Sequence, residues 1–387
     1  MKKKRILVIN QTDSFWGGEA SLEKAILAMN QKYRVILLTP GGELSKRLEG
    51  KIKVISSIGI DRLNRASNSF WIIKFIYMIF ISFFEVLFYI KRFKPNVIHC
   101  FSETAAFYSI LPAFLTNKKI ICQLHLVIIK SSFWESVSIF ISFFINRYIV
   151  ISNVVKNRMV EIGHNPNNIT VINSGTDINN QFNPDNVIKG LFRKKYKYSN
   201  DSYLVALIGS IQPLKGQHIF IDAINIFKDK YNYSKIKFLI IGSPLNEKYF
   251  SNIKNLIRLN KLDKVLQIIN KIDHSFIPNV LKDIDMFVFT SCIPDAFPRS
   301  IIEAMSMQKV IIAAGTGGVN EQIKDGSNGL LYSPYDSNEL KEKIKFIYNN
   351  PDIGSMIKIN ARRDAKIFFS DSIYEKNILL FYRNYFN

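Results

Sequence analysis

Short runs of apolar residues, many of them β-branched, recur along the whole chain and are separated by stretches with helical spacing. The runs are nearly continuous rather than alternating with polar residues, which is typical of strands that are buried on both faces of a parallel sheet. Strands alternating with helices in this way predict an α/β protein with two doubly wound sheets in succession. The predicted strands are Arg5–Asn10, Arg34–Thr39, Asn96–Cys100, Lys119–His125, Arg147–Ser152, Thr170–Asn173, Tyr203–Ser210, Lys237–Gly242, Val265–Ile269, Asp285–Thr290 and Lys309–Ala313.

The polar segment Asp177–Gly190 interrupts this alternation near the middle of the chain. It reads DINNQFNPDNVIKG and is rich in Asn, Asp, Pro and Gly, as linkers between domains are. We therefore predict an N-terminal domain over residues 1–184 and a C-terminal domain over residues 185–365. Residues 366–387 have helical spacing and many aromatic side chains, and we interpret them as a C-terminal helix that could pack back on the N-terminal domain.

The charge balance narrows the classes of partner. The chain has 387 residues with 52 Lys plus Arg and 31 Asp plus Glu, a net charge of +21, which favours an anionic partner. No helix-turn-helix, zinc or RNP-type motif is visible, so we expect no nucleic-acid partner, although a strongly salt-dependent gel shift would revive that interpretation.

Three scattered cysteines do not make a disulfide framework or a zinc site. The first apolar run is too short for a signal peptide, so we expect a cytoplasmic protein.

The segment after the predicted strand Asp285–Thr290 carries the strongest chemical signal. It reads SCIPDAFPRSIIEAMSMQKVIIAAGTGGVNEQIKDGSNGLLY. Asp295 lies in a loop that its flanking prolines keep out of a helix, and Glu303 lies inside the helix that follows. Ligands of doubly wound sheets bind at the carboxyl ends of the strands, and a helix N-terminus there offers N–H groups to an anion. The two acids can therefore face one pocket.

This stretch resembles the donor-binding domain of glycosyltransferase family 4. The family pattern has the form EGFPxxxxEAM, then GG-x-x-E, then dG-x-x-G-l-l, and this chain has DAFPRSIIEAM, GGVNE and DGSNGLL in that order. Other parts of the chain also resemble family segments: GSIQPLKG at Gly209–Gly216, INSGTD at Ile172–Asp177, VISN at Val150–Asn153, the Gly17–Gly18 pair before a helix, and His125 at the end of a strand.

The resemblance implies the GT-B fold, in which two Rossmann-like domains face each other across a cleft. It implies a retaining hexosyltransferase that moves a sugar from a UDP- or GDP-linked donor to a glycan or lipid-linked acceptor, as in bacterial surface polysaccharide biosynthesis. No cofactor and no metal is implied.

Physical reasoning assigns a role to each matched residue. The leaving diphosphate gains negative charge as the glycosidic bond breaks, and a cation such as Lys215 stabilises that charge most in the transition state. The resemblance implies that Glu303 binds the ribose hydroxyls. Asp295 would bind a hydroxyl of the donor sugar, and His125 could contact the donor sugar. Glycines let the backbone approach a phosphate closely. The expected donor-binding residues are Gly17, Gly18, Gly209, Ser210, Lys215, Phe297, Pro298, Arg299, Glu303, Gly317 and Gly318.

Two positions depart from the family pattern. Asp295 stands where the family usually has Glu, and its side chain is one methylene shorter. Ser210 stands where the family often has Arg, so one positive charge near the diphosphate is missing, and Lys215 or Arg299 must supply it. Lys215 could also be an ordinary surface lysine, Asp295 a turn cap, and His125 a core histidine.

Two helical stretches are unusually apolar. Residues Ser69–Ile90 are long enough to cross a bilayer core, but Lys74 and Glu85 would be costly there. A shorter run covers Ser131–Asn146. We therefore expect interfacial helices with Lys91, Arg92 and Lys94 near an anionic membrane, at the inner face of the cell membrane. The alternative is that both helices simply pack on the sheet.

Two further functions remain open at this stage. One is a GT-B sugar-nucleotide epimerase, which would bind the same nucleotide without an acceptor, but the chain has only 5 His and no visible cluster of them. The other is a non-catalytic GT-B binding subunit, favoured only by the Asp295 and Ser210 departures. Nucleotide binding without sugar transfer would distinguish it.

Overall fold

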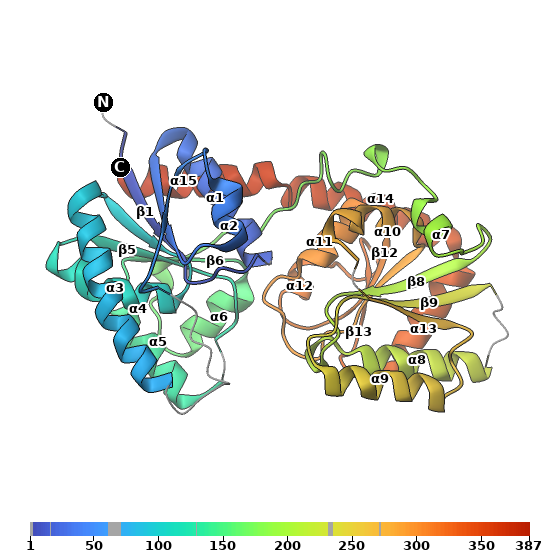
Figure 1. Ribbon diagram of the computed structural model, residues 1–387. Coiled ribbons are helices and arrows are strands. Elements are labelled where there is room, and N and C mark those ends of the chain that lie inside the picture. The colour runs from blue at the N-terminus through green and yellow to red at the C-terminus, as the bar shows by residue number, and fades with distance from the viewer. Residues whose placement is uncertain (1–2, 16, 61–70, 129, 231–234, 271) are drawn as a thin grey trace. The chain divides into compact units, whose positions relative to one another are not determined.

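The protein divides into two compact units, each described here by itself (Figure 1). The computed structural model describes residues 3–15, 17–60, 71–128, 130–230, 235–270 and 272–387. The N-terminal unit comprises Met1–Ser174 together with Ser372–Asn387, and the C-terminal unit comprises Gly175–Asp371.

The N-terminal unit is a seven-stranded parallel sheet in the order β3-β2-β1-β4-β5-β6-β7. The interior strand β1 buries Ile6, Leu7, Val8 and Ile9 completely, because helices cover both faces. The strands are β1 (Arg5–Ile9), β2 (Arg34–Thr39), β3 (Lys53–Ser56), β4 (Val97–Cys100), β5 (Lys119–Leu124), β6 (Arg147–Val150) and β7 (Ile169–Val171). The helices are α1 (Gly17–Lys32), α2 (Gly42–Leu48), α3 (Trp71–Phe93), α4 (Glu103–Leu115), α5 (Ser132–Ser142), α6 (Asn153–Glu161) and α15 (Asp371–Phe386).

The C-terminal unit is a six-stranded parallel sheet in the order β10-β9-β8-β11-β12-β13. The strands are β8 (Tyr203–Ile208), β9 (Ile236–Ile241), β10 (Leu266–Ile269), β11 (Met286–Phe289), β12 (Val310–Ala314) and β13 (Leu330–Tyr332). The helices are α7 (Leu191–Lys195), α8 (Gln217–Lys230), α9 (Glu247–Leu259), α10 (Ile277–Asp283), α11 (Arg299–Ser306), α12 (Val319–Gln322), α13 (Ser337–Asn349) and α14 (Pro351–Phe368).

The prediction of two doubly wound parallel sheets is confirmed, and every predicted strand is present with slightly different ends. Two strands were not predicted, β3 and β13. Both lie at an edge of their sheet, with only 4 and 3 residues respectively. An edge strand has a partner on one side only, so it needs no long apolar run, and β3 is partly exposed along its length.

The boundary between the units lies at Ser174–Gly175, before the Asn- and Pro-rich segment rather than within it. Long-range hydrogen bonds explain the difference from the predicted boundary at residue 184. Thr176 N donates to Phe369 O at 2.9 Å, and the Arg362 guanidinium donates to the carbonyls of Ile178 (3.2 Å) and Phe182 (3.0 Å). Helix α14 therefore holds the segment after Ser174 in the C-terminal unit.

Helix α15 belongs to the N-terminal unit, and the second crossing lies at Asp371–Ser372 rather than at residue 365. Tyr374 and Tyr382 are buried in the core of that unit. The Tyr382 hydroxyl lies 2.5 Å from Nδ1 of His99 in β4, and Gln123 Nε2 in β5 donates to the Tyr374 hydroxyl at 3.2 Å. The helix thus completes one face of the N-terminal sheet.

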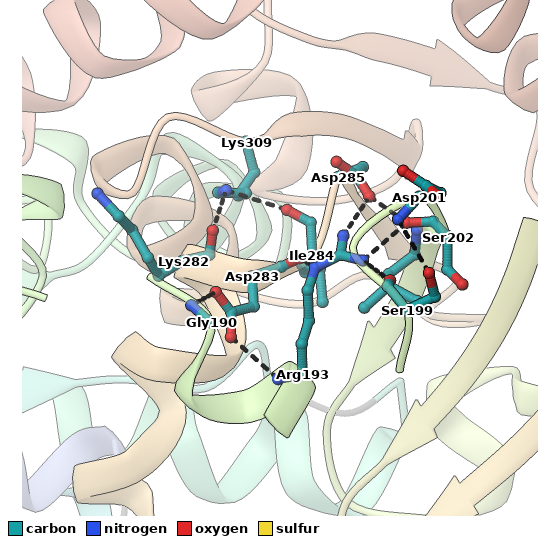
Figure 2. A network of polar contacts seen from close by, with 11 residues as sticks. Gly190, Arg193, Ser199, Asp201, Ser202, Lys282, Asp283, Ile284, Asp285 and Lys309 are labelled. Atoms are coloured by element: carbon teal, nitrogen blue, oxygen red, sulfur yellow. Dashed lines mark hydrogen bonds and ion pairs between the residues drawn. The ribbon is translucent and has the colours of Figure 1, made fainter. Parts of the chain in front are cut away.

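A buried polar network joins the N-terminal ends of β11 and β12 to the segment before β8 (Figure 2). The Asp283 carboxylate accepts from the backbone N–H groups of Gly190 (2.5 Å), Phe192 (2.8 Å) and Arg193 (3.1 Å), which caps α7. The Arg193 guanidinium pairs with Asp285 Oδ2 at 2.9 Å. Lys309 Nζ donates to the carbonyls of Lys282 (3.2 Å) and Ile284 (3.0 Å). The network anchors the two strands at the ends opposite to their carboxyl ends.

The predicted apolar helices are present as α3 and α5. Residues 69 and 70 of the predicted stretch, and the side chain of Lys74, lie outside the described residues. Within the described part of the chain, no helix is long and apolar enough to cross a membrane.

Candidate functional site

Lys215 and Asp295 meet at the carboxyl ends of β8 and β11. Lys215 Nζ lies 2.8 Å from Asp295 Oδ2, and both side chains are about one-quarter exposed, at 27% and 24%. The loop that carries Lys215 is held by Thr290, whose hydroxyl donates to Lys215 O at 2.7 Å. Gly216 has a φ of +66°, and a Cβ there would lie 2.0 Å from Thr290 O. Only glycine allows the two loops to approach this closely.

The Gly317–Gly318 turn after β12 packs against the loop that carries Asp295. A Cβ on Gly317 would lie 2.5 Å from Asp295 O, and one on Gly318 would lie 2.1 Å from Ala296 O. Gly318 N also donates to Asp295 O at 2.8 Å. These close contacts are made within the protein, so both glycines are needed to place the Asp295 loop whether or not a ligand is bound.

Glu303 faces His274, a residue that the sequence did not single out. Glu303 lies in α11 and is buried, and its Oε1 is 3.6 Å from His274 Nε2. The pKa of His274 lies above its ordinary value because the Glu303 carboxylate stabilises the imidazolium. Asp295 and Glu303 thus have different partners, although the sequence indicated that they could share one pocket.

Three predicted residues surround the start of α11. Arg299 is its first residue and Pro298 precedes it as the N-cap. The Phe297 ring is buried and packs edge-to-face against the Phe369 ring, with centroids 5.6 Å apart. Phe297 is therefore a packing residue in this structure, and it anchors the loop between Asp295 and α11.

Gly209 and Ser210 lie directly after β8 and differ from the other glycine sites. A Cβ on Gly209 would meet no atom within 4 Å, so open space adjoins this backbone. The Ser210 hydroxyl accepts from Gln212 Nε2 at 2.8 Å, and the Ser210 carbonyl accepts from Gln217 Nε2 at 2.8 Å. These glutamines shape the loop where the family often has an arginine.

The N-terminal unit brings His125 and Gly18 to one aromatic ring. The rings of Phe101 and His125 have centroids 4.5 Å apart, and a Cβ on Gly18 would lie 3.7 Å from Phe101 Cε1. His125 Nε2 lies 2.9 Å from Gln123 Nε2, and Gln123 also bonds Tyr374 of α15. Gly17 is the first residue of α1. Phe101, Gln123 and Tyr374 thus support a site that the sequence indicated only through His125 and the glycine pair.

The predicted residues therefore form two groups, one in each unit. In the C-terminal unit, Lys215, Asp295, Gly317 and Gly318 form a connected cluster at the carboxyl ends of β8, β11 and β12. The supporting residues Thr290 and His274 were missed because each is a single polar residue outside any motif. Their partners become visible only when the loops are folded together.

Sequence models of two families match the chain. The family described as Glycosyltransferase Family 4 matches residues 17–180, and the family described as Glycosyl transferases group 1 matches residues 189–364. Between them, they cover most of both units.

Known relatives agree with these matches. CapM of Staphylococcus aureus, named as a capsular polysaccharide biosynthesis glycosyltransferase, is 24% identical over 318 residues, covering 79% of this chain and 80% of that protein. A glycosyltransferase of Methanocaldococcus jannaschii is 29% identical over 183 residues, but the match spans only 47% of this chain and 49% of that relative.

Solved structures show the same fold. A glycosyltransferase from Rickettsia africae superposes with a TM-score of 0.85 at 22% identity, over 99% of both chains. HepE of Anabaena, solved in complex with UDP and glucose, gives a TM-score of 0.81 at 20% identity, over 98% of this chain and 99% of that one. The fold is therefore GT-B, and the chain belongs to the glycosyltransferases that join a family 4 domain to a group 1 domain.

Proposed function

We propose that this glycosyltransferase takes a hexose from a nucleoside diphosphate sugar and transfers it, with retention of anomeric configuration, to a glycan or lipid-linked acceptor. The observation that carries the proposal is the cluster of Lys215, Asp295 and the Gly317–Gly318 turn at the carboxyl ends of three parallel strands, where ligands of such sheets bind. The complex of HepE with UDP and glucose supports the donor class. The name of CapM supports a surface polysaccharide as the product.

Lys215 supplies the positive charge for the leaving diphosphate in this proposal. Its ammonium pairs with the Asp295 carboxylate at 2.8 Å, which holds it in place. A diphosphate that approaches Lys215 then meets a cation whose position is already fixed. The open space beside Gly209 leaves room for the oxygens of the diphosphate. Preorganised charge of this kind acts most strongly on the transition state.

Asp295 and Glu303 take different tasks. Asp295 contacts a hydroxyl of the donor sugar and also pairs with Lys215. Its side chain, one methylene shorter than the Glu usual in the family, makes both contacts. Glu303 accepts from the ribose hydroxyls and is oriented by His274. On the N-terminal unit, His125 contacts the donor sugar, and its ring is held by Phe101. No metal and no cofactor takes part, because Lys215 and backbone N–H groups neutralise the diphosphate.

The first experiment is a thermal-shift panel with UDP, GDP, ADP, CDP and TDP. A ligand at about 100 times its dissociation constant adds about 2.7 kcal/mol to the free energy of unfolding. We expect UDP, GDP or both to raise the melting temperature, and ADP, CDP and TDP to leave it unchanged. If no nucleotide shifts the transition, the donor class is wrong.

Lys215→Ala is the matched test of catalysis. Removing one group that stabilises transition-state charge lowers the rate by roughly 10²–10³-fold, so we expect a loss of this size in sugar transfer with the nucleotide identified by the panel. Lys264→Ala is the control, because Lys264 is an exposed lysine just before β10, at the N-terminal edge of the same sheet. Nucleotide binding without any sugar transfer in the unaltered protein would instead favour a non-catalytic binding subunit.

A further inference from the structure

Exposed apolar side chains gather on three helices of the N-terminal unit. Helix α4 packs against both α3 and α5, and the three helices lie together on this unit in Figure 1. Together with the residues just after α5, they expose large apolar side chains, and Phe114 and Phe143 are 72% and 80% exposed. This apolar face consists of Ile76, Tyr77, Phe80, Phe84, Phe88, Leu111, Phe114, Leu115, Phe133, Phe140, Phe143 and Phe144.

Helix α3 is apolar on two sides. Its inner stripe repeats every fourth residue and is fully packed in the unit: the apolar Met78, Val86 and Ile90, with the small, buried Ser82 among them. Its outer stripe also repeats every fourth residue and is more than half exposed: Ile76, Phe80, Phe84 and Phe88. A helix that packs on a sheet needs only the inner stripe, and its outer side is normally polar. The outer stripe therefore has a use other than the core of this unit.

Helices α4 and α5 extend the outer stripe of α3. On α4, Leu111, Phe114 and Leu115 are spaced as one helix face and are exposed. On α5, Phe133 and Phe140 are exposed, and the chain continues into exposed Phe143 and Phe144. A patch of this size on one side of a soluble domain marks an interaction surface.

The acids of these helices are each held by hydrogen bonds or an ion pair within the unit. The Glu85 carboxylate accepts from Ser57 Oγ (2.6 Å), Ile58 N (3.2 Å) and Gly59 N (3.0 Å). Glu103 accepts from Ser138 Oγ at 2.5 Å, and Glu135 pairs with Arg158.

Basic residues collect at the end of α3. Lys91 and Arg92 lie in the last turn of α3, and the Arg92 guanidinium lies 5.8 Å from the centroid of the Phe88 ring. Lys94 follows directly after α3 and is also exposed. Aromatic side chains next to Lys and Arg are what a membrane interface with anionic lipid accommodates.

We propose that the apolar face of α3, α4 and α5 binds the surface of a bilayer that contains anionic lipid. The phenylalanines enter the boundary between headgroups and acyl chains, and the basic residues at the end of α3 contact lipid phosphates. A second copy of this chain is a poorer occupant, because each copy has a net charge of +21 and would repel the other. The proposal does not depend on the donor site, and its test uses no nucleotide.

The test is co-sedimentation with vesicles made of equal parts phosphatidylcholine and phosphatidylglycerol, at low salt. We expect the protein to pellet with these vesicles and to bind pure phosphatidylcholine vesicles much less. The triple variant Phe80→Ser, Phe84→Ser, Phe88→Ser should lower the apparent affinity at least tenfold. Lys91→Glu with Arg92→Glu should reduce binding to the anionic vesicles and leave the weak binding to phosphatidylcholine unchanged.

The control is the triple variant Leu245→Ser, Leu259→Ser, Ile359→Ser, which removes three exposed apolar side chains from the C-terminal unit. It should bind vesicles like the unaltered protein, and circular dichroism should show native helix content in both triple variants. Equal loss of binding in the two, or no pelleting of the unaltered protein, would overturn the proposal. A dimer in sedimentation equilibrium that the Phe variant dissociates, without vesicle binding, would assign the face to a second copy.

Discussion

The two units share a doubly wound parallel architecture, but they differ in where they place charged and apolar side chains. The C-terminal unit buries charged groups deeply, and Arg193, Asp283, Lys341, Arg362 and Asp364 are all at most 6% exposed. The N-terminal unit instead exposes a row of phenylalanines on α3, α4 and α5. The C-terminal unit, which carries the Lys215 cluster, is stabilised partly by directional hydrogen bonds and ion pairs between buried charged groups. The N-terminal unit instead presents exposed apolar side chains, whose attraction to a membrane does not depend on direction.

A matched pair of carboxylates tests this difference most strongly. In the C-terminal unit, Asp283 accepts from three backbone N–H groups and is 2% exposed. In the N-terminal unit, Glu85 accepts from two backbone N–H groups and one hydroxyl at a half-buried position. We expect Asp283→Ala to lower the free energy of unfolding by about 3 kcal/mol or more, because it leaves three buried backbone N–H groups without an acceptor, at about 1–3 kcal/mol each. Glu85→Ala should cost roughly 1–3 kcal/mol.

Urea unfolding followed by circular dichroism measures both variants. Asp283→Asn and Glu85→Gln are the controls, because an amide oxygen retains part of the acceptor capacity and should recover part of each loss. An equal cost at the two positions would show that the C-terminal unit does not depend more on its buried polar contacts.

The buried lysine predicts a pH dependence of intermediate size. Burial lowers the pKa of Lys309 to about 7, despite the opposing influence of Asp285. Between about pH 7 and 10.5 the unfolded chain retains this proton and the folded chain has lost it. The unfolded state therefore binds more protons, and the free energy of unfolding rises with pH in that range, by up to about 1.4 kcal/mol per pH unit.

Lys309→Met removes this dependence. Subtracting the unfolding free energies of the variant from those of the unaltered protein, measured from pH 7 to 10, should give a difference that grows with pH in favour of the unaltered protein. A difference that stays constant would mean that Lys309 keeps its proton in the fold.

Two histidines, one in each unit, give pH effects of opposite sign. His164 in the N-terminal unit is buried and its pKa is lowered to about 4 by desolvation, so its contribution to stability falls as the pH drops from 6.5 towards 4. Glu303 raises the pKa of His274 in the C-terminal unit. The contribution of His274 is full below pH 6.5 and is lost as the pH rises through the raised pKa, and it is roughly 0.2–1 kcal/mol because the side chain is mostly exposed.

The variants His164→Gln and His274→Gln separate the two contributions. Melting temperatures between pH 4 and 8 should show that His164→Gln reduces acid sensitivity and that His274→Gln removes a small stabilisation at acid pH. The same sign for both variants would contradict the assignment of His274 to Glu303.

The interior strands were predictable because burial on both faces requires an unbroken apolar run, as in Arg5–Ile9. Two of the four edge strands, Lys53–Ser56 and Leu330–Tyr332, were missed, because the first is partly exposed along its length and the second has only 3 residues. The linker composition at Asp177–Gly190 placed the domain boundary too late, because hydrogen bonds from Arg362, far along the chain, hold that segment. Local composition carries no information about such distant partners.

The candidate site was likewise predictable from the sequence only in part. Lys215 and Asp295 stand in spaced motifs, so they could be selected from the sequence, but their ion pair required the folded loops. His274 has no motif and was found only through its distance to Glu303. On the N-terminal unit, the apolar helices were visible as long hydrophobic runs, yet the exposed side of α4 was not, because its Leu and Phe residues follow the spacing of an ordinary packed helix.

The packing of α15 on the N-terminal sheet has a consequence for how the protein is made. Tyr374, Ile378 and Tyr382 join the core of the first unit, although the ribosome adds them only after the whole second unit. Domains usually fold in the order of synthesis. Here the first unit leaves the exit tunnel with one face of its sheet incompletely covered, and part of its apolar core stays exposed until the second unit has been translated. Chaperone demand during translation should therefore fall on the half that is made first.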